Sequence, residues 1–292
     1  MQPGAFKMRQ AYSQIVTATH HLFIPAGRLC YCRILGVTGM KTTILVTAAI
    51  AILAWGNAAA ADELKLKVAT EGAYPPFNSL DASGNLVGFD VDIAKALCQQ
   101  MNATCSFVAV PWDDIIGRLE KNEYDLVVAS MSLTEERAKR MEYSAPYYRS
   151  HSAFAADPNR FKDISPAALK GFRIAAGSQT IQSEYLKKNY PDSKIILTKD
   201  QPEAQKLLQA GEVDLILADS IDLLTFLQAP ESSKFDYVGD PVTNDFLKSS
   251  AHITAHKGNA ELIKKVNVAL DQIRLNGTYD RINNAYFPFS IY

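Results

Sequence analysis

The sequence predicts an α/β protein of two lobes, each formed around a sheet rich in parallel strands. From residue 64 onward, strand-like and helix-like patterns alternate along the chain, which is typical of parallel sheets with helical crossovers. A short helix–turn–strand segment is also repeated, weakly, later in this region. A long amphipathic segment near the end then provides a helix that we expect to return to the first lobe.

The beginning of the chain is not expected to belong to this fold. From Met40 the sequence has a basic start, an apolar stretch at Ile44–Trp55 and a run of small residues. This pattern predicts a secretory signal peptide over residues 40–61, cleaved near Ala60–Ala61. The apolar stretch is too short for a comfortable membrane span, and a buried N-terminal helix is the alternative. Because no cysteine lies at the cleavage point, nothing suggests a lipid anchor. We therefore expect a soluble, exported protein.

Residues 1–39 precede the predicted signal and are interpreted as a non-native extension from an over-long gene start. They contain no acidic residue and show no clear period. Removing residues 1–61 takes away five basic and no acidic residues, so 25 of the 30 basic residues remain against 31 acidic ones, a net charge of −6. An acidic exported chain without a Lys/Arg cluster is a poor candidate for binding nucleic acid.

The first lobe is predicted to begin with a strand. Leu64–Thr70 alternates between polar and apolar residues, and Phe89–Met101 then has apolar residues at helical spacing. The same criteria predict the other elements of this lobe, the strands Ser106–Val110 and Asp125–Ala129 and the helix Trp112–Lys121.

After Tyr148 the pattern starts again, which predicts a second lobe over residues 150–250. Strands and helices alternate once more, with turn-forming residues between them. The predicted strands are Phe172–Ala176, Lys194–Thr198 and Val213–Ala218, and the predicted helices are Ile181–Lys188, Glu203–Gln209 and Ile221–Leu227.

The end of the chain predicts two more helices. Glu261–Leu275 is a long amphipathic segment ended by Asn276–Gly277, and Tyr279–Ala285 is a shorter one. We expect both to pack on the first lobe, which would then comprise residues 62–149 and 251–292.

A chain of this organisation crosses between the lobes twice. The crossings are predicted near residues 149–156 and 247–254. Two extended crossings form a hinge about which lobes can close.

The weak repeat indicates where a ligand would bind. Leu119–Ser130 reads LEKNEYDLVVAS, and Leu208–Asp219 reads LQAGEVDLILAD. One copy ends at Ser130 and the other at Asp219, both at the ends of predicted strands. Because ligands of open α/β sheets bind beyond the carboxyl ends of strands, we expect these two residues to face a shared cleft.

The segment Asp125–Arg137 has the features of a receptor for a small anion. A strand ends at Ser130 and Ser132, and a helix begins at once with Thr134 as its N-cap. Hydroxyl groups, the N–H groups of a helix start and Arg137 together suit a carboxylate. The alternative is a capped surface helix that carries a solvated arginine.

The acidic residues of the cleft suggest that the ligand is an amino acid with a cationic side chain. Arg137 suits a carboxylate and Asp219 suits an ammonium group, so the pair fits an α-amino acid. Glu71 follows the first strand and is flanked by Tyr74 and Trp112, which suits a cation. The alternatives are that Asp219 caps the following helix, that Trp112 is a core residue and that Glu71 is a solvated turn residue.

Two cysteines remain after the leader. Cys98 lies late in a predicted helix and Cys105 at the start of the next strand, a reversal that can bring their Cα atoms within disulfide range. Export favours oxidation, and closing so small a loop predicts a stabilisation of about 2–3 kcal/mol. Metal binding is the weaker alternative because no histidine accompanies the pair.

Three ordered segments, Glu71–Phe77, Gly88–Cys98 and Ala129–Arg137, resemble the polar amino-acid-binding proteins of bacterial ABC importers. The similarity is greatest to members for lysine, arginine, ornithine, histidine and opines, and it covers residues 64–292, including Asn276–Tyr279. It implies a periplasmic-binding-protein (Venus flytrap) fold that closes over its ligand. It also implies a monomeric, non-enzymatic protein of the periplasm, without cofactor or metal, whose partner is an importer permease.

The resemblance also implies roles for individual residues. Arg137 and Ser132 would bind the α-carboxylate, and Asp219 would bind the α-ammonium group. Tyr74 and Trp112 would sandwich the ligand side chain. By position, Glu71 would bind the distal cation of the ligand, Ser130 would line the site, and Thr180 would contact the carboxylate. Cys98 and Cys105 would match a disulfide of the basic-ligand members.

Two departures from relatives are visible. Relatives usually have Gly-Thr-Thr or Gly-Thr-Ile where this chain has Gln179-Thr180-Ile181, so Gln179 is expected to alter the loop or add a side-chain contact. The acid at position 71 is Glu, as in relatives that bind opines, and its extra methylene extends its reach. Ligand class is therefore better defined than ligand identity.

The leading hypothesis is a solute-binding protein that delivers a cationic amino acid to an ABC importer. The alternative is a periplasmic cyclohexadienyl dehydratase of the same fold, in which Arg137 holds a substrate carboxylate and Glu71 protonates a leaving hydroxyl. The sequence shows no carboxylate that must be un-ionised at neutral pH, which favours binding over catalysis. A sensor ectodomain is disfavoured because no membrane span follows the binding region.

Overall fold

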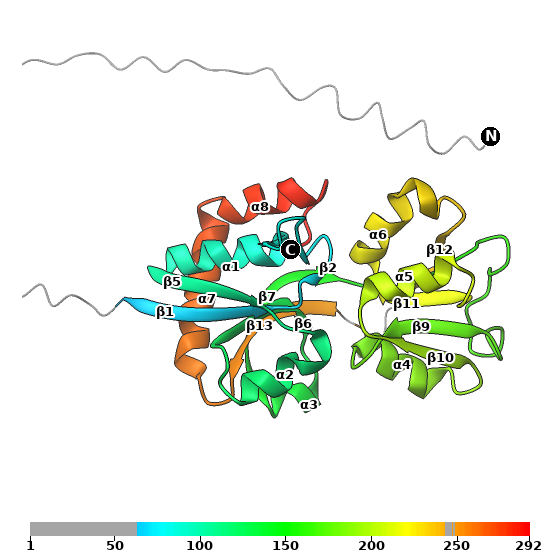
Figure 1. The fold of residues 1–292 in the computed structure, drawn as a ribbon, viewed down its shortest axis with the longest axis horizontal. Helices are drawn as coiled ribbons and strands as arrows, with labels where there is room; N and C mark the ends of the chain where they lie inside the picture. The colour runs from blue at the N-terminus through cyan, green and yellow to red at the C-terminus, as the bar shows by residue number, and fades with distance from the viewer. Residues whose placement is uncertain (1–62, 243–246, 248) are drawn as a thin grey trace, which may run out of the picture. The chain divides into compact units, whose positions relative to one another are not determined.

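The computed structural model describes residues 63–242, 247 and 249–292, and the predicted leader, its cleavage site and the extension at residues 1–39 lie outside this part of the chain. Two five-stranded sheets and a small three-stranded sheet organise the described residues (Figure 1). Among these residues no helix is both long enough and apolar enough to cross a membrane.

The first sheet contains the strands β1 (Leu64–Thr70), β5 (Ala103–Ala109), β6 (Leu126–Ser132), β7 (Met141–Ser150) and β13 (Ser249–His256). Their order across the sheet is β5-β1-β6-β13-β7. β1 pairs in parallel with β5 and β6, whereas β13 pairs antiparallel with β6 and β7. The sheet is therefore parallel on one side and antiparallel on the other.

Helices from both ends of the chain cover the first sheet (Figure 1). They are α1 (Phe89–Gln100), α2 (Trp112–Glu120), α3 (Glu135–Ala138), α7 (Ala260–Leu275) and α8 (Thr278–Tyr286). Apolar residues of α1, α7 and α8 share one buried cluster with residues of β1, β6 and β13. The tail of the chain thus returns to the first sheet, as its amphipathic pattern predicted.

The second sheet contains β8 (Ser152–Ala156), β9 (Arg173–Gly177), β10 (Lys194–Thr198), β11 (Leu215–Asp219) and β12 (Asp236–Val242), in the order β10-β9-β11-β8-β12. Its helices are α4 (Ile181–Asn189), α5 (Gln201–Gln209), α6 (Ser220–Gln228) and the 3₁₀ turn η1 (Pro230–Ser232). β9 pairs in parallel with β10 and β11, and β8 pairs antiparallel with β11 and β12.

The remaining strands form the small sheet, β2 (Ala73–Tyr74), β3 (Asn78–Leu80) and β4 (Leu86–Val87), between β1 and α1. Sequence periodicity did not predict these strands, nor β7, β8, β12 and β13. β1 and β10 have the predicted bounds. Both large sheets are mixed because the four unpredicted longer strands pair antiparallel.

The chain passes from the first sheet to the second at a single residue, His151, between β7 and β8. It returns between Val242 of β12 and Ser249 of β13, a stretch of which the structure describes only Leu247. Ser150, just before the first passage, donates a hydrogen bond from Oγ to Asp219 Oδ1 at 2.7 Å, which ties the end of β7 to the end of β11.

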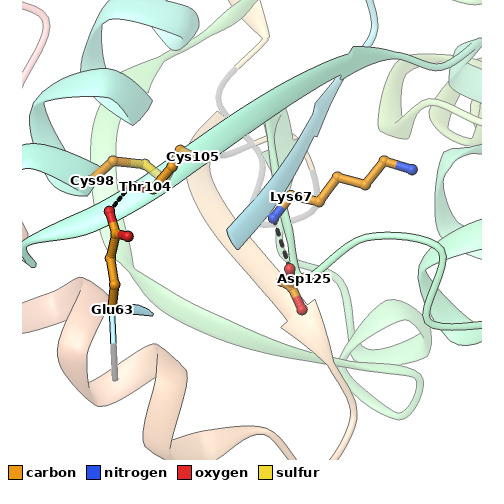
Figure 2. The surroundings of a disulfide bond; sticks show 6 residues. All are labelled: Glu63, Lys67, Cys98, Thr104, Cys105 and Asp125. Atoms are coloured by element: carbon orange, nitrogen blue, oxygen red, sulfur yellow. Dashed lines mark hydrogen bonds between the residues drawn. A yellow bond between two sulfur atoms is a disulfide. The ribbon is translucent and has the colours of Figure 1, made fainter. Parts of the chain in front are cut away.

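Cys98 of α1 and Cys105 of β5 form a disulfide bond, as their spacing predicted, with Cα atoms 6.2 Å apart. Figure 2 shows this bridge beside Thr104, whose hydroxyl donates to Glu63 at the start of β1. Asp125, just before β6, accepts a 2.7 Å hydrogen bond from the backbone N–H of Lys67. The bridge therefore fixes α1 to the edge of the first sheet, far from the strand ends where a ligand is expected.

Candidate functional site

One cavity is lined by residues of both large sheets and contains about 730 Å³ of empty space, part of which is open to solvent. All eight residues predicted from the sequence line it: Glu71, Tyr74, Trp112, Ser130, Ser132, Arg137, Thr180 and Asp219. The structure thus brings the predicted residues together at one place.

Arg137 is held between the two sheets. Its backbone N–H donates to Thr134 Oγ1 at 3.1 Å, so Thr134 caps the short helix α3 as predicted. Its Nη1 donates to the carbonyl of Ser132 at 3.0 Å, and its Nη2 donates across the cleft to the carbonyl of Gln179 at 2.6 Å. The side chain also lies over Trp112, with Cζ 5.4 Å from the ring centroid. Arg137 is only 9% exposed, so the alternative of a solvated surface arginine is wrong.

A buried network fixes the end of β6. Ser130 has a backbone φ of +54°, a left-handed conformation that is uncommon for residues other than glycine. Its N–H donates to Tyr147 Oη at 3.0 Å, and its Oγ donates to Asp90 Oδ2 at 3.0 Å. Tyr147 Oη in turn donates to Asp90 Oδ1 at 2.6 Å. Asp90 therefore holds Ser130 in its unusual conformation.

The same carboxylate holds the turn that carries Glu71. Asn78 Nδ2 donates to Asp90 Oδ2 at 2.8 Å, and Asn78 Oδ1 accepts from the N–H of Gly72 at 2.7 Å. Asp90 and Asn78 are fully buried, and burial raises the pKa of Asp90 to about 6, although its hydrogen bonds oppose this. Sequence reasoning missed Asp90, because an acid in the first turn of a helix is usually exposed and favourable there without further partners.

Asp219 has two roles. It is the N-cap of α6, with Oδ1 accepting from the N–H of Ile221 at 2.8 Å and from Ser150 Oγ at 2.7 Å. The helix-cap alternative is therefore correct, and the residue still lines the cavity at the end of β11. Burial raises the pKa of Asp219 to about 6, against the lowering effect of the bonds from Ser150 and Ile221.

Glu71 is a carboxyl group with an unusual charge state. It follows β1 and is partly exposed within the cavity. Burial, and then the nearby charges of Asp200, Asp90 and Asp113, raise its pKa to about 8. Glu71 is thus largely protonated at neutral pH unless a cation approaches it. Sequence reasoning found no carboxylate that must be un-ionised at neutral pH, and it did not reveal the raised pKa of Glu71.

The aromatic residues of the site are anchored in the core. Tyr74 stacks on Phe77, with ring centroids 5.3 Å apart, and Phe77 is fully buried. Trp112 is the first residue of α2 and packs partly against the buried cluster around Ile115 while it lines the cavity. Trp112 can therefore pack in the core and also contact a ligand.

Gln179, where the sequence departs from the usual pattern, lies in the loop that precedes α4. This residue has a φ of +52°, a left-handed conformation that glycine adopts freely and that is uncommon for other residues. Its Nε2 donates across the cleft to the carbonyl of Asp113 at 3.4 Å, and Ser178 Oγ donates to the Asp113 carboxylate. Gln179 thus adds the side-chain contact that the sequence left as one of two possibilities.

Thr180 caps α4 in a capping box. Its Oγ1 accepts from the N–H of Ser183 at 3.1 Å and donates to the carbonyl of Gly177 at 2.8 Å. Its hydroxyl is therefore engaged within the loop.

Sequence reasoning missed one wall of the cavity, the connection from β10 to α5. Lys199, Asp200 and Gln201 line the cavity there. The strand Lys194–Thr198 was predicted correctly, so the rule that ligands bind beyond strand ends could have identified these residues. With them the cavity is lined by three carboxylates, of Glu71, Asp200 and Asp219, against two basic side chains.

Replacing Asp90 by asparagine tests the buried network. The asparagine amide would place its own N–H hydrogens opposite groups that now donate hydrogen bonds to Asp90. We therefore expect the free energy of unfolding to fall by about 1–3 kcal/mol. Urea denaturation of residues 62–292 measures this. Asp271→Asn, on the exposed face of α7, is the control and should change stability by less than about 0.5 kcal/mol. Equal stability of Asp90→Asn and wild type would contradict the assigned network.

Glu71→Gln tests the raised pKa of Glu71. The native state keeps this proton up to about pH 8, whereas the unfolded chain loses it near the ordinary glutamate pKa of 4.5. The native state thus binds more protons in this window, so Glu71 lowers wild-type stability as the pH rises from about 4.5 to 8. We expect Glu71→Gln to gain stability relative to wild type between pH 5 and pH 8 in urea denaturation without ligand. Parallel pH profiles would show that Glu71 titrates normally.

Comparison with known proteins places this geometry in a family. The chain is similar to the ABC transporter arginine-binding protein 1 of Escherichia coli (strain K12), with 31% identity over 250 residues, 85% of this chain and 100% of the relative. A solved ancestral arginine-binding protein bound to arginine matches with a TM-score of 0.71 at 32% identity, covering 76% of this chain and 98% of that one.

A second solved structure bears on the catalytic alternative. It is an ancestral amino-acid-binding protein described as a precursor of cyclohexadienyl dehydratase, and it matches with a TM-score of 0.68 at 28% identity, covering 76% of this chain and 95% of that one. The two-lobed α/β fold predicted from the sequence is confirmed by these similarities. Because the family model matches residues 66–289, the chain belongs to the bacterial extracellular solute-binding proteins, family 3.

Proposed function

We propose that this protein is a periplasmic solute-binding protein that captures a cationic amino acid by lobe closure and delivers it to an ABC importer. The observation that carries the proposal is the buried guanidinium of Arg137 in a cavity that Glu71 and Asp219 also line. A fixed cation and separate carboxylates are what the three charges of such a ligand require. The similarity to proteins named for arginine binding supports the same ligand class.

The α-amino acid group would bind at the strand ends of the two sheets. Arg137 has five N–H donors, two of which bond to the carbonyls of Ser132 and Gln179, so others remain for a carboxylate. Ser132 would add its hydroxyl to the same carboxylate. Asp219, whose carboxylate is already fixed by Ser150, would accept from the α-ammonium group.

The ligand side chain would then extend between Tyr74 and Trp112 toward Glu71. An arriving cation favours the ionised carboxylate, so it would lower the pKa of Glu71 from about 8 and create the ion pair that holds it. Exclusion of water from the closed cleft would strengthen each of these interactions. The single-residue passage at His151 is the natural place for a hinge between open and closed forms.

One observation favours a second candidate function, a cyclohexadienyl dehydratase. A carboxyl group that stays protonated near neutral pH, as Glu71 does, can act as a general acid. Arg137 would hold a substrate carboxylate while Glu71 protonates the leaving hydroxyl. We favour binding over catalysis because the paired cation and carboxylates fit an amino acid without further assumptions.

A thermal-shift experiment distinguishes the two functions. Residues 62–292 would be screened against the twenty amino acids, octopine-type opines and prephenate. A ligand present at a hundred times its dissociation constant adds about 2.7 kcal/mol to the stability of the native state, which is readily seen. We expect shifts with cationic amino acids or opines. A shift with prephenate alone, accompanied by its turnover, would establish the dehydratase instead.

Arg137→Ala tests the carboxylate site. We expect binding of every α-amino acid ligand to weaken by about 2–5 kcal/mol, because the carboxylate loses its partner inside a closed cleft. Isothermal titration calorimetry gives the dissociation constants. Arg140→Ala is the matched control, since Arg140 is exposed and pairs with Glu120 at 2.6 Å outside the cavity. An unchanged dissociation constant in Arg137→Ala would refute the role of this residue.

A further inference from the structure

We propose that Asp200 is a specificity-determining residue, and that the ligand's distal cation is held between Glu71 on one wall of the cavity and Asp200 on the other. Two facing carboxylates of this kind favour a guanidinium over an ammonium group. This inference rests on the proposed function and deepens it, because it assigns the side-chain subsite to residues of both sheets.

The two carboxylates come from opposite walls. Glu71 follows the end of β1 in the first sheet, and Asp200 follows the end of β10 in the second. Both line the same cavity. The helix α5, which begins directly after Asp200, contacts the short strand β2, which begins two residues after Glu71. The connection β10–α5 is thus placed against the turn that carries Glu71.

The electrostatics of Glu71 agree with this placement. Among the charged groups that raise its pKa, Asp200 has the largest effect, ahead of Asp90 and Asp113. A negative charge that disfavours the ionisation of a facing carboxyl group forms, together with that group, a site that a cation stabilises.

Asp200 is held in a fixed orientation. It is the N-cap of α5, and its Oδ1 accepts from the N–H of Glu203 at 2.9 Å. Glu203 reaches back, with Oε2 accepting from the N–H of Lys199 at 2.8 Å. The bond from Glu203 uses one carboxylate oxygen, so the group is oriented by its helix in advance of any ligand.

A further polar side chain belongs to the same wall. Gln201 lines the cavity and is only 8% exposed. The amide oxygen of Gln201 can accept one further N–H of a guanidinium.

The chemistry of the two carboxylates selects the cation. A guanidinium is planar and carries N–H groups on several edges, so it can bond to carboxylates on both sides at once. An ammonium group is a compact and strongly hydrated charge with three donors on one atom, so it is costlier to desolvate between two walls. Arginine should therefore bind more tightly than lysine, and its neutral isostere citrulline should bind weakly.

The simplest alternative is that Asp200 only caps α5. Asp200→Asn separates the two roles, because asparagine caps a helix about as well as aspartate but carries no charge. Asp200→Ser also keeps a capping side chain and provides a second variant of the same kind. Glu231→Gln is the matched control, because it removes a charge from an exposed position of η1 that does not line the cavity.

Calorimetric titration of residues 62–292 with L-arginine and L-citrulline tests the proposal. We expect Asp200→Asn and Asp200→Ser to weaken arginine binding about tenfold or more and citrulline binding less than about threefold. Glu231→Gln should leave both dissociation constants unchanged. The effects of Asp200→Asn and Glu71→Gln on arginine binding should not add, because both residues hold the same cation.

The outcomes separate this proposal from the proposed function. If arginine binds Asp200→Asn as tightly as wild type, or if Glu231→Gln causes an equal loss, Asp200 is only a cap and the proposal is overturned while the proposed function stands. Equal losses for arginine and citrulline would also overturn it. If wild type binds neither cationic amino acids nor opines, the proposed function itself fails and this inference falls with it.

Discussion

The cavity wall of the first sheet depends on one buried carboxylate. Asp90 accepts hydrogen bonds from Asn78, Ser130 and Tyr147, which belong to three separate strands. It can reach them because Gly88 lets the start of α1 approach the chain at Phe77, where a side chain would collide with the backbone carbonyl. The turn with Glu71 and the end of β6 with Ser130 and Ser132 are thus fixed relative to one another before any ligand arrives, which lowers the entropic cost of binding.

The second sheet faces this wall with side chains that also begin helices. Thr180, Asp200 and Asp219 are the N-caps of α4, α5 and α6, so each is oriented by a helix that packs on the sheet behind it. Capping and binding use the same property, a polar side chain fixed at a strand end. Arg137, whose guanidinium bonds to Gln179, connects the two walls directly. The proposed function follows from this opposition of a fixed cation and fixed carboxylates.

Much of this arrangement could be predicted from the sequence, and the exceptions have physical causes. The motif Asp125–Arg137 was identified because strand, cap and arginine are adjacent in the chain. β7 and β13 were missed because they contain buried polar groups that satisfy one another over a long sequence distance, such as Ser144 and His252, with His252 Nδ1 2.8 Å from the Ser144 carbonyl. Asp90 was missed because an acid in the first turn of a helix is usually exposed, whereas its partners Asn78, Ser130 and Tyr147 come near only in the fold. The pKa of Glu71 likewise depends on neighbours such as Asp200 that only the fold brings near. Local patterns thus located the site, whereas its charge states required the tertiary structure.

The most direct test of the central claim is a crystal structure of residues 62–292 grown with L-arginine. The account predicts one arginine in the cavity, with its carboxylate on Arg137 and Ser132, its α-ammonium group on Asp219 and its guanidinium at Glu71. An arginine bound in the reverse orientation, with its carboxylate away from Arg137, would contradict the account. So would a cavity that stays without arginine at saturating concentration.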